Sequence, residues 1–76
     1  KKYQAAFNIF KMNFDKYPKD IYTNIGMVKG YAAIGNKTEA IRFAKDAKSL
    51  VPDENTKSYL DQFIQYILED KDITNL

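Results

Sequence analysis

The residues that break helices are few in this chain, and they divide it into segments of helical length. Pro18, the Gly35-Asn36 pair and Pro52 separate four longer stretches. Each stretch carries apolar residues at spacings of three and four, the pattern of a helix with one buried face. No stretch alternates strictly between apolar and polar residues, and no Asn-Gly type turn occurs. The sequence therefore predicts an all-α fold of about four helices.

The expected helices have recognisable ends. Pro18 ends the first one, because the residue before a proline avoids the helical conformation. Asp20 is a suitable N-cap for the second, and Gly35 suits the left-handed position after its last turn. Asn36, with Glu39 three residues later, has the spacing of a capping box at the start of the third. We expect helices at about 2–16, 21–34, 36–50 and 54–71.

The chain also corresponds to itself at an offset of 34 residues. Identical residues at this offset include Ala6 and Ala40, Lys11 and Lys45, and Pro18 and Pro52. In both copies a small residue in a helix is followed twelve positions later by a proline. A period of 34 residues with two helices is typical of a helical repeat.

Residues 21–54 resemble one complete tetratricopeptide repeat. Positions where that family has large apolar, aromatic, turn, small, small and proline residues are occupied here by Met27, Tyr31, Gly35, Ala40, Ala47 and Pro52. Residues 1–18 resemble the second helix of a preceding, partial repeat, and 55–72 the helix that closes such an array. The resemblance implies antiparallel helical hairpins in a right-handed α-α superhelix, forming a single domain over 1–76. The alternative is a plain four-helix domain without repeat ancestry.

Several positions depart from the repeat pattern. Asn24 replaces a common large aromatic residue, Val28 a small one, and Ala44 an aromatic one. In the last helix, a strict 34-residue register would turn polar residues inward, namely Ser58, Asp61, Gln62 and Gln65. We therefore expect this helix to be rotated or shifted, or its apolar face to dock on another structure.

The amino-acid composition argues against catalysis and metal binding. The chain has no histidine and no cysteine, which removes the commonest general base, metal ligands and thiol nucleophile. We expect no catalytic, cofactor-binding or metal-binding residues and no enzymatic activity. Glu69, Asp70 and Asp72 are expected to form a solvated helix end, and 36–38, an Asn-Lys-Thr sequon, to form a turn and cap.

Charge and hydropathy exclude two classes of partner. The net charge is +2, and the twelve basic residues are spread along the chain, so we expect no nucleic-acid binding. No run of about 18 apolar residues is present, so we expect no membrane insertion. The absence of cysteine fits a reducing or an oxidising compartment equally well.

Protein binding is the predicted function. In tetratricopeptide repeats, the first helix of each repeat lines a concave groove that holds a peptide or a neighbouring domain. This resemblance implies a non-catalytic protein–protein interaction module whose groove is lined by Tyr22, Ile25, Lys29 and Ala33. For two of these residues a structural interpretation stays open: Ile25 packs against the first or last helix, and Lys29 is a solvated charge.

The chain is short for a repeat array, which needs about three repeats for stability. It begins Lys1-Lys2 without a methionine, and we expect a fragment of a longer protein. The apolar face of the first helix, with Tyr3, Phe7 and Phe10, is expected to be half covered. The second functional hypothesis is accordingly a C-terminal appendage that docks on a larger domain of the same chain. Pairing of two copies as a homodimer is a further alternative.

Overall fold

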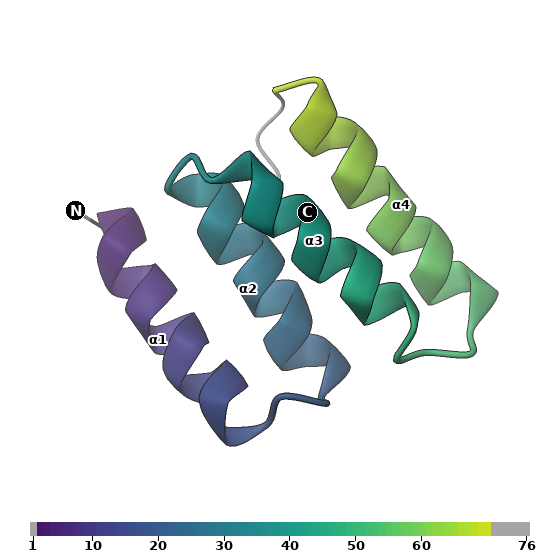
Figure 1. Cartoon of the computed structure of the whole chain (residues 1–76), viewed down its shortest axis with the longest axis horizontal. Coiled ribbons are helices and arrows are strands. Elements are labelled where there is room, and N and C mark those ends of the chain that lie inside the picture. The colour runs from purple at the N-terminus through teal and green to yellow at the C-terminus, as the bar shows by residue number, and fades with distance from the viewer. Residues whose placement is uncertain (1, 71–76) are drawn as a thin grey trace.

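The fold is a row of four helices, described for residues 2–70 in a computed structural model. The helices are α1 (Lys2–Lys16), α2 (Ile21–Ala33), α3 (Lys37–Lys48) and α4 (Glu54–Leu68). They lie side by side in chain order, and each runs antiparallel to the next (Figure 1). Residues 2–70 contain no strand. The predicted all-α fold of four helices is confirmed, and α3 and α4 end slightly earlier than expected.

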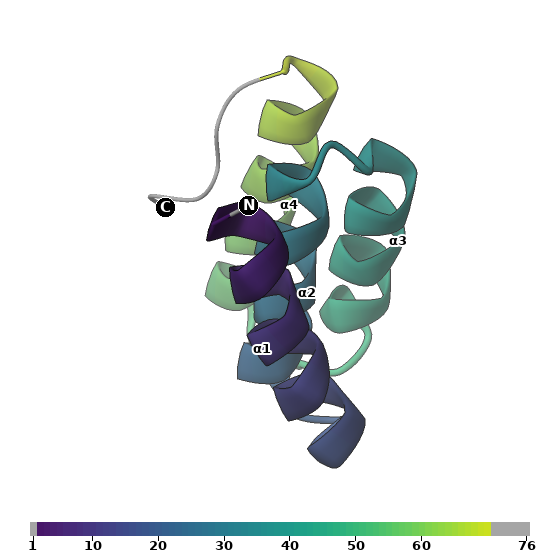
Figure 2. The same ribbon diagram turned by 90° about the vertical axis from the view of Figure 1, so that its left-hand side faces the viewer.

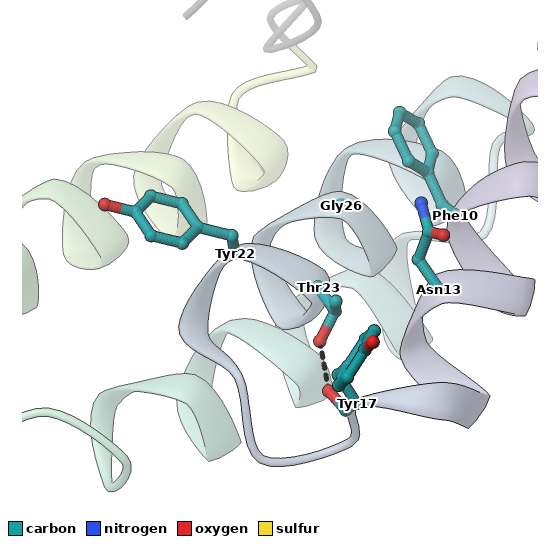
Figure 3. Close-up of a pocket in the computed structure, with 6 residues that line it drawn as sticks. All are labelled: Phe10, Asn13, Tyr17, Tyr22, Thr23 and Gly26. Carbon is teal, nitrogen blue, oxygen red and sulfur yellow. Dashed lines mark hydrogen bonds between the residues drawn. The ribbon is translucent and has the colours of Figure 1, made fainter.

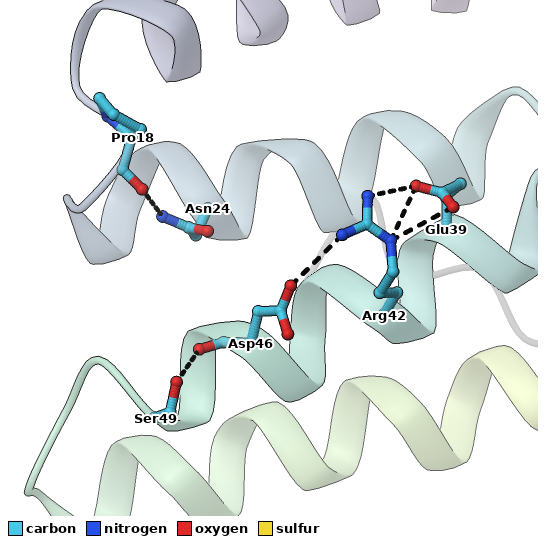
Figure 4. Close-up of polar contacts among 6 residues, drawn as sticks. All are labelled: Pro18, Asn24, Glu39, Arg42, Asp46 and Ser49. Atoms are coloured by element: carbon cyan, nitrogen blue, oxygen red, sulfur yellow. Dashed lines mark hydrogen bonds and ion pairs between the residues drawn. The ribbon is translucent and has the colours of Figure 1, made fainter.

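Aspartate and asparagine side chains cap the N-termini of three helices, α2, α3 and α4. Asp20 accepts a hydrogen bond from the backbone N of Tyr22, and Asp53 accepts one from that of Thr56. Asn36 accepts one from the backbone N of Glu39 at 3.2 Å. The Glu39 carboxylate is bonded to Arg42, which also reaches Asp46 (Figure 4). Asn36 thus makes its half of the predicted capping box, while Glu39 pairs along the helix.

A tight turn ends α2 and sets α3 against it. Gly35 has a φ of 86°, in the left-handed region that favours glycine. The backbone N of Asn36 donates to the carbonyl of Tyr31 at 2.9 Å, and that of Gly35 to the carbonyl of Ala32. These bonds satisfy carbonyls at the helix end, as expected from the sequence.

Aromatic rings join the first three helices. The ring of Phe7 in α1 meets that of Tyr31 in α2 edge-on at 4.8 Å between centroids. Tyr31 stacks on Phe43 of α3 at 5.5 Å, and Phe14 of α1 meets Phe43 at 5.1 Å. Viewed from the side, α1 lies in front of α2 and α3 lies beside them (Figure 2). The aromatic cluster thus fills one side of the α1–α2 pair.

The last helix is rotated relative to a strict 34-residue register. Leu60, Phe63 and Ile67 are buried, and the polar residues that strict register would turn inward are exposed. Phe63 is buried as Met27 is, and the two lie 36 residues apart, which is two more than the strict register. Two residues correspond to a rotation of about 200°. The expectation of a rotated helix is confirmed, and its apolar face covers the core of this chain.

Asn24 is a buried polar residue at a position where the repeat pattern has an aromatic one. It is 3% exposed. Its amide donates to the carbonyl of Pro18 at 2.9 Å (Figure 4). The same amide also donates to the carbonyl of Asp20 at 2.8 Å. Asn24 therefore fastens the turn between α1 and α2 to the first turn of α2.

The first helix is covered unevenly. Phe7 is buried, whereas Phe10 and Phe14 are half-buried and Tyr3 is exposed. Ile9 and Met12, one turn apart, are 58% and 70% exposed. The half-covered face expected from the sequence is thus present, although Phe7 itself lies in the core.

Candidate binding groove between α1 and α2

Two hollows lie between α1 and α2 and meet at Phe10. The lower hollow has a volume of about 280 Å³ and is lined by Phe10, Asn13, Tyr17, Tyr22, Thr23 and Gly26 (Figure 3). The upper hollow, of about 190 Å³, is lined by Tyr3, Ala6, Phe10, Lys29, Gly30 and Ala33. Because Phe10 borders both, the two hollows lie next to each other along the two helices, and we call them together the α1–α2 groove.

Two glycines form the floor of this groove. Gly26 and Gly30 are one turn apart on α2 and border the lower and the upper hollow, respectively. A Cβ at Gly26 would lie 3.1 Å from Cδ1 of Phe10, and one at Gly30 would lie 3.2 Å from Cδ2. The glycines therefore let α1 approach α2 closely and leave space beside the Phe10 ring.

The turn between the helices closes the lower end of the groove. The Thr23 hydroxyl donates to the carbonyl of Tyr17 at 2.5 Å (Figure 3). It also lies within hydrogen-bond distance of the carbonyl of Asp20, at 2.9 Å. These bonds hold the backbone that carries Tyr17. The ring of Tyr22 extends away from Phe10 and Tyr17 (Figure 3). It is 80% exposed and so accessible to a partner.

The four residues predicted to bind a partner fall into two groups. Tyr22 borders the lower hollow, and Lys29 and Ala33 border the upper one. Ile25 borders neither hollow; it is half-buried and packs against the core. Lys29 is half-buried, with its ammonium 5.8 Å from the centroid of the Phe63 ring of α4. Its charge therefore lies on the α4 side of the upper hollow.

The segment that contains α1 and α2 is rich in basic residues. Residues 1–33 contain six lysines and two aspartates, whereas 34–76 carry a net charge of −2. Among residues 2–70, no carboxylate lines either hollow. Lys16 lies over the ring of Tyr17 at 5.7 Å, and the described part of the chain offers it no ion pair. Of the two aspartates, Asp15 pairs with Lys11 and Asp20 caps α2.

Several polar residues outside the groove form ion pairs within the chain. A third hollow, between α3 and α4, is bordered by Lys48 and Lys57, which pair with Asp61 and Glu54. Within residues 2–70, no group of acidic side chains is arranged to hold a metal ion. Asp70 pairs with Lys37, and Asp72 of the predicted acidic helix end lies outside the described residues.

Much of the groove was not predicted from the sequence. Phe10 was assigned to the apolar face of the first helix, and Gly26 and Gly30 were given no structural role. The available signal was the four-residue spacing of the two glycines opposite an aromatic residue. Both positions are equally compatible with a filled core, so the spacing alone does not place them at a surface.

Comparisons with protein-family models, with curated proteins and with solved structures find no match to this chain. The resemblance to tetratricopeptide repeats therefore rests on the residues themselves and stays a prediction. None of the described helices is long and apolar enough to cross a membrane.

Proposed function

We propose that this chain is a non-catalytic binding module that holds a segment of another protein in the α1–α2 groove. The observation that carries the proposal is the pair of adjoining hollows around Phe10, bordered by accessible aromatic and small residues. Aromatic side chains are enriched in protein interfaces because they bury much apolar area with little loss of side-chain entropy.

The repeat-like architecture belongs to the same proposal. The 34-residue correspondence, the left-handed Gly35 and the antiparallel order of the helices support a tetratricopeptide-like superhelix. In such an array the surfaces of successive helices hold partners, which fits a groove that runs along two helices. The absence of histidine and cysteine from the sequence supports a role without catalysis.

The test is a selection of peptides from a randomised display library on the immobilised chain. Asn13 is exposed and borders the lower hollow, so Asn13→Trp fills the groove without disturbing the core. Asn8→Trp is the matched control, because Asn8 is exposed on α1 and borders neither hollow. We expect peptides that bind the parent chain and Asn8→Trp but are lost with Asn13→Trp. Equal recovery on all three proteins would contradict the proposal.

A second candidate function is docking on a larger domain, and the exposed Ile9 and Met12 favour it. They lie one turn apart on α1 and border neither hollow of the groove. The test is Ile9→Lys with Met12→Lys in the full protein that carries this chain. Faster proteolytic release of the segment, with its own fold intact, would support docking. Unchanged release would leave the groove as the functional surface.

A further inference from the structure

The dimensions and charge of the α1–α2 groove define a class of partner. We propose that it binds an acidic amphipathic helix of another protein, with two large apolar side chains two turns apart. This inference rests on the proposed function and adds the chemistry and the conformation of the bound segment.

The spacing of the hollows sets the spacing of the apolar side chains. Ala6 and Gly30 border the upper hollow, and Asn13 and Gly26 the lower one. Ala6 and Asn13 are seven residues apart in one helix, a rise of about 10.5 Å. Side chains at positions i and i+7 of a bound helix have the same separation. Each would enter one hollow, on either side of Phe10.

The architecture favours a helical rather than an extended partner. An extended peptide gains affinity by adding main-chain hydrogen bonds to a sheet edge, and residues 2–70 contain no strand to offer one. A helix satisfies its own backbone and lays its apolar face into a groove between helices. The groove between α1 and α2 therefore suits the helix-in-groove mode.

The charge distribution favours an acidic partner. Lys16 lies at the lower end of the groove, over Tyr17, and Lys29 borders the upper hollow. A carboxylate on the edge of a bound helix would meet Lys16, and among the described residues no carboxylate of the lining would repel it. Electrostatic complementarity of this kind speeds association and disfavours partners of the wrong charge.

None of the four described helices of a second copy offers such a surface. The acidic helix α4 has its apolar residues Leu60, Phe63 and Ile67 buried in its own core. The exposed apolar pair of α1, Ile9 and Met12, lies on a helix that is basic overall. The groove is therefore matched to a different protein.

The test measures fluorescence anisotropy of designed helical peptides with the full 76-residue chain. The probe is about 15 residues long, with leucines at i and i+7 and glutamates on its flanks. One matched probe carries lysines in place of the glutamates, and another carries alanines in place of the leucines. A fourth carries a central proline, which breaks the helix.

We expect the acidic probe to bind about fivefold or more tightly than the lysine probe, and to weaken as salt rises. Lys16→Glu should weaken it about two- to fivefold, whereas the matched change Lys45→Glu on α3 should not. Asn13→Trp should weaken it and Asn8→Trp should not. The alanine and proline probes should bind much more weakly than the parent probe.

Four outcomes would overturn the inference. Equal binding of acidic and lysine probes, still lost with Asn13→Trp, would keep the groove function and remove the acidic partner. Equal binding of the proline probe would remove the helical partner. No binding by any probe would remove the inference altogether, and the library selection then decides whether the groove binds other peptides. A dimer that is lost with Asn13→Trp in sedimentation would identify a second copy as the occupant instead.

Discussion

The ring of Phe10 lies against the backbone of Gly26, so closely that an added Cβ would be 3.1 Å from Cδ1 of the ring. At Gly30 an added Cβ would meet both Phe7, at 3.1 Å, and Phe10, at 3.2 Å. The two glycines thus have different neighbours: a half-buried ring at the first, and a buried ring as well at the second.

Because the neighbours differ, we expect alanine to destabilise the fold more at position 30 than at position 26. Gly30→Ala should lower the free energy of unfolding by about 1 kcal/mol, because crowding of two rings outweighs the gain in helix propensity. Gly26→Ala should change it by less than about 0.5 kcal/mol, because Phe10 can move into the groove while the helix gains propensity. Urea unfolding of both variants checks this. Equal destabilisation would mean that Phe10 is held as rigidly as Phe7.

Removal of the Asn24 amide should release the turn between α1 and α2. Asn24→Ala removes the hydrogen bonds of a buried amide to the carbonyls of Pro18 and Asp20, and should cost about 1–3 kcal/mol. Asn55→Ala, at an exposed asparagine of α4, is the control and should cost less than about 0.5 kcal/mol. Urea unfolding measures both. Similar values for the two variants would show that the turn does not depend on the amide.

Local features of the fold were predictable because local rules decide them. Pro18 and Asp20 fix the end of α1 and the start of α2 through backbone sterics and capping. Gly35 ends α2 because it can adopt a positive φ. These effects depend on neighbours in the sequence, and the structure has them where they were expected.

Features that depend on tertiary packing were less predictable. The rotation of α4 about its axis cannot be predicted from the repeat period alone. It is determined by the burial of Phe63 and its apolar neighbours. Asn24 departs from an apolar pattern for a reason that appears only when the Pro18 carbonyl is placed beside it. The groove combines an aromatic residue with glycines. Both kinds of residue also occur in protein cores, so the residue types do not indicate a surface groove. The aromatic cluster that includes Phe43 covers one face of the α1–α2 pair. The location of the groove depends on which face that is, and this is decided by tertiary packing.

The N-cap of α4 predicts a specific dependence on pH. The pKa of Asp53 is lowered by hydrogen bonds from the Thr56 hydroxyl and backbone N and from the backbone N of Asn55. A carboxyl with a lowered pKa in the folded state stabilises it fully above the ordinary aspartate pKa. This contribution is lost as the pH falls through the lowered value. Asp53→Asn should therefore be less stable than the parent chain at neutral pH, and the difference should narrow in acid.

The Thr56 hydroxyl is the main cause of this shift, and Thr56→Val tests it. Removal of the hydroxyl should raise the pKa of Asp53 toward its ordinary value, while the backbone bond keeps part of the shift. An NMR titration of the Asp53 carboxyl carbon in both proteins measures the change. An unchanged pKa in the variant would assign the shift to the backbone bonds alone.

The rotation of α4 is tested by a pair of adjacent residues. Phe63 is fully buried, whereas Gln62 is exposed although strict 34-residue register would turn it inward. Phe63→Ala should lower the free energy of unfolding by about 3–5 kcal/mol, because it leaves a cavity between α4 and the core. A chain of this length has a total stability of about 4–11 kcal/mol, so this loss is a large fraction of it. Gln62→Ala should change the stability by less than about 0.5 kcal/mol. Circular dichroism during urea unfolding measures both effects. A larger effect at Gln62 than at Phe63 would contradict the rotation, because it would mean that Gln62 faces the core and that the apolar face of α4 lies at the surface.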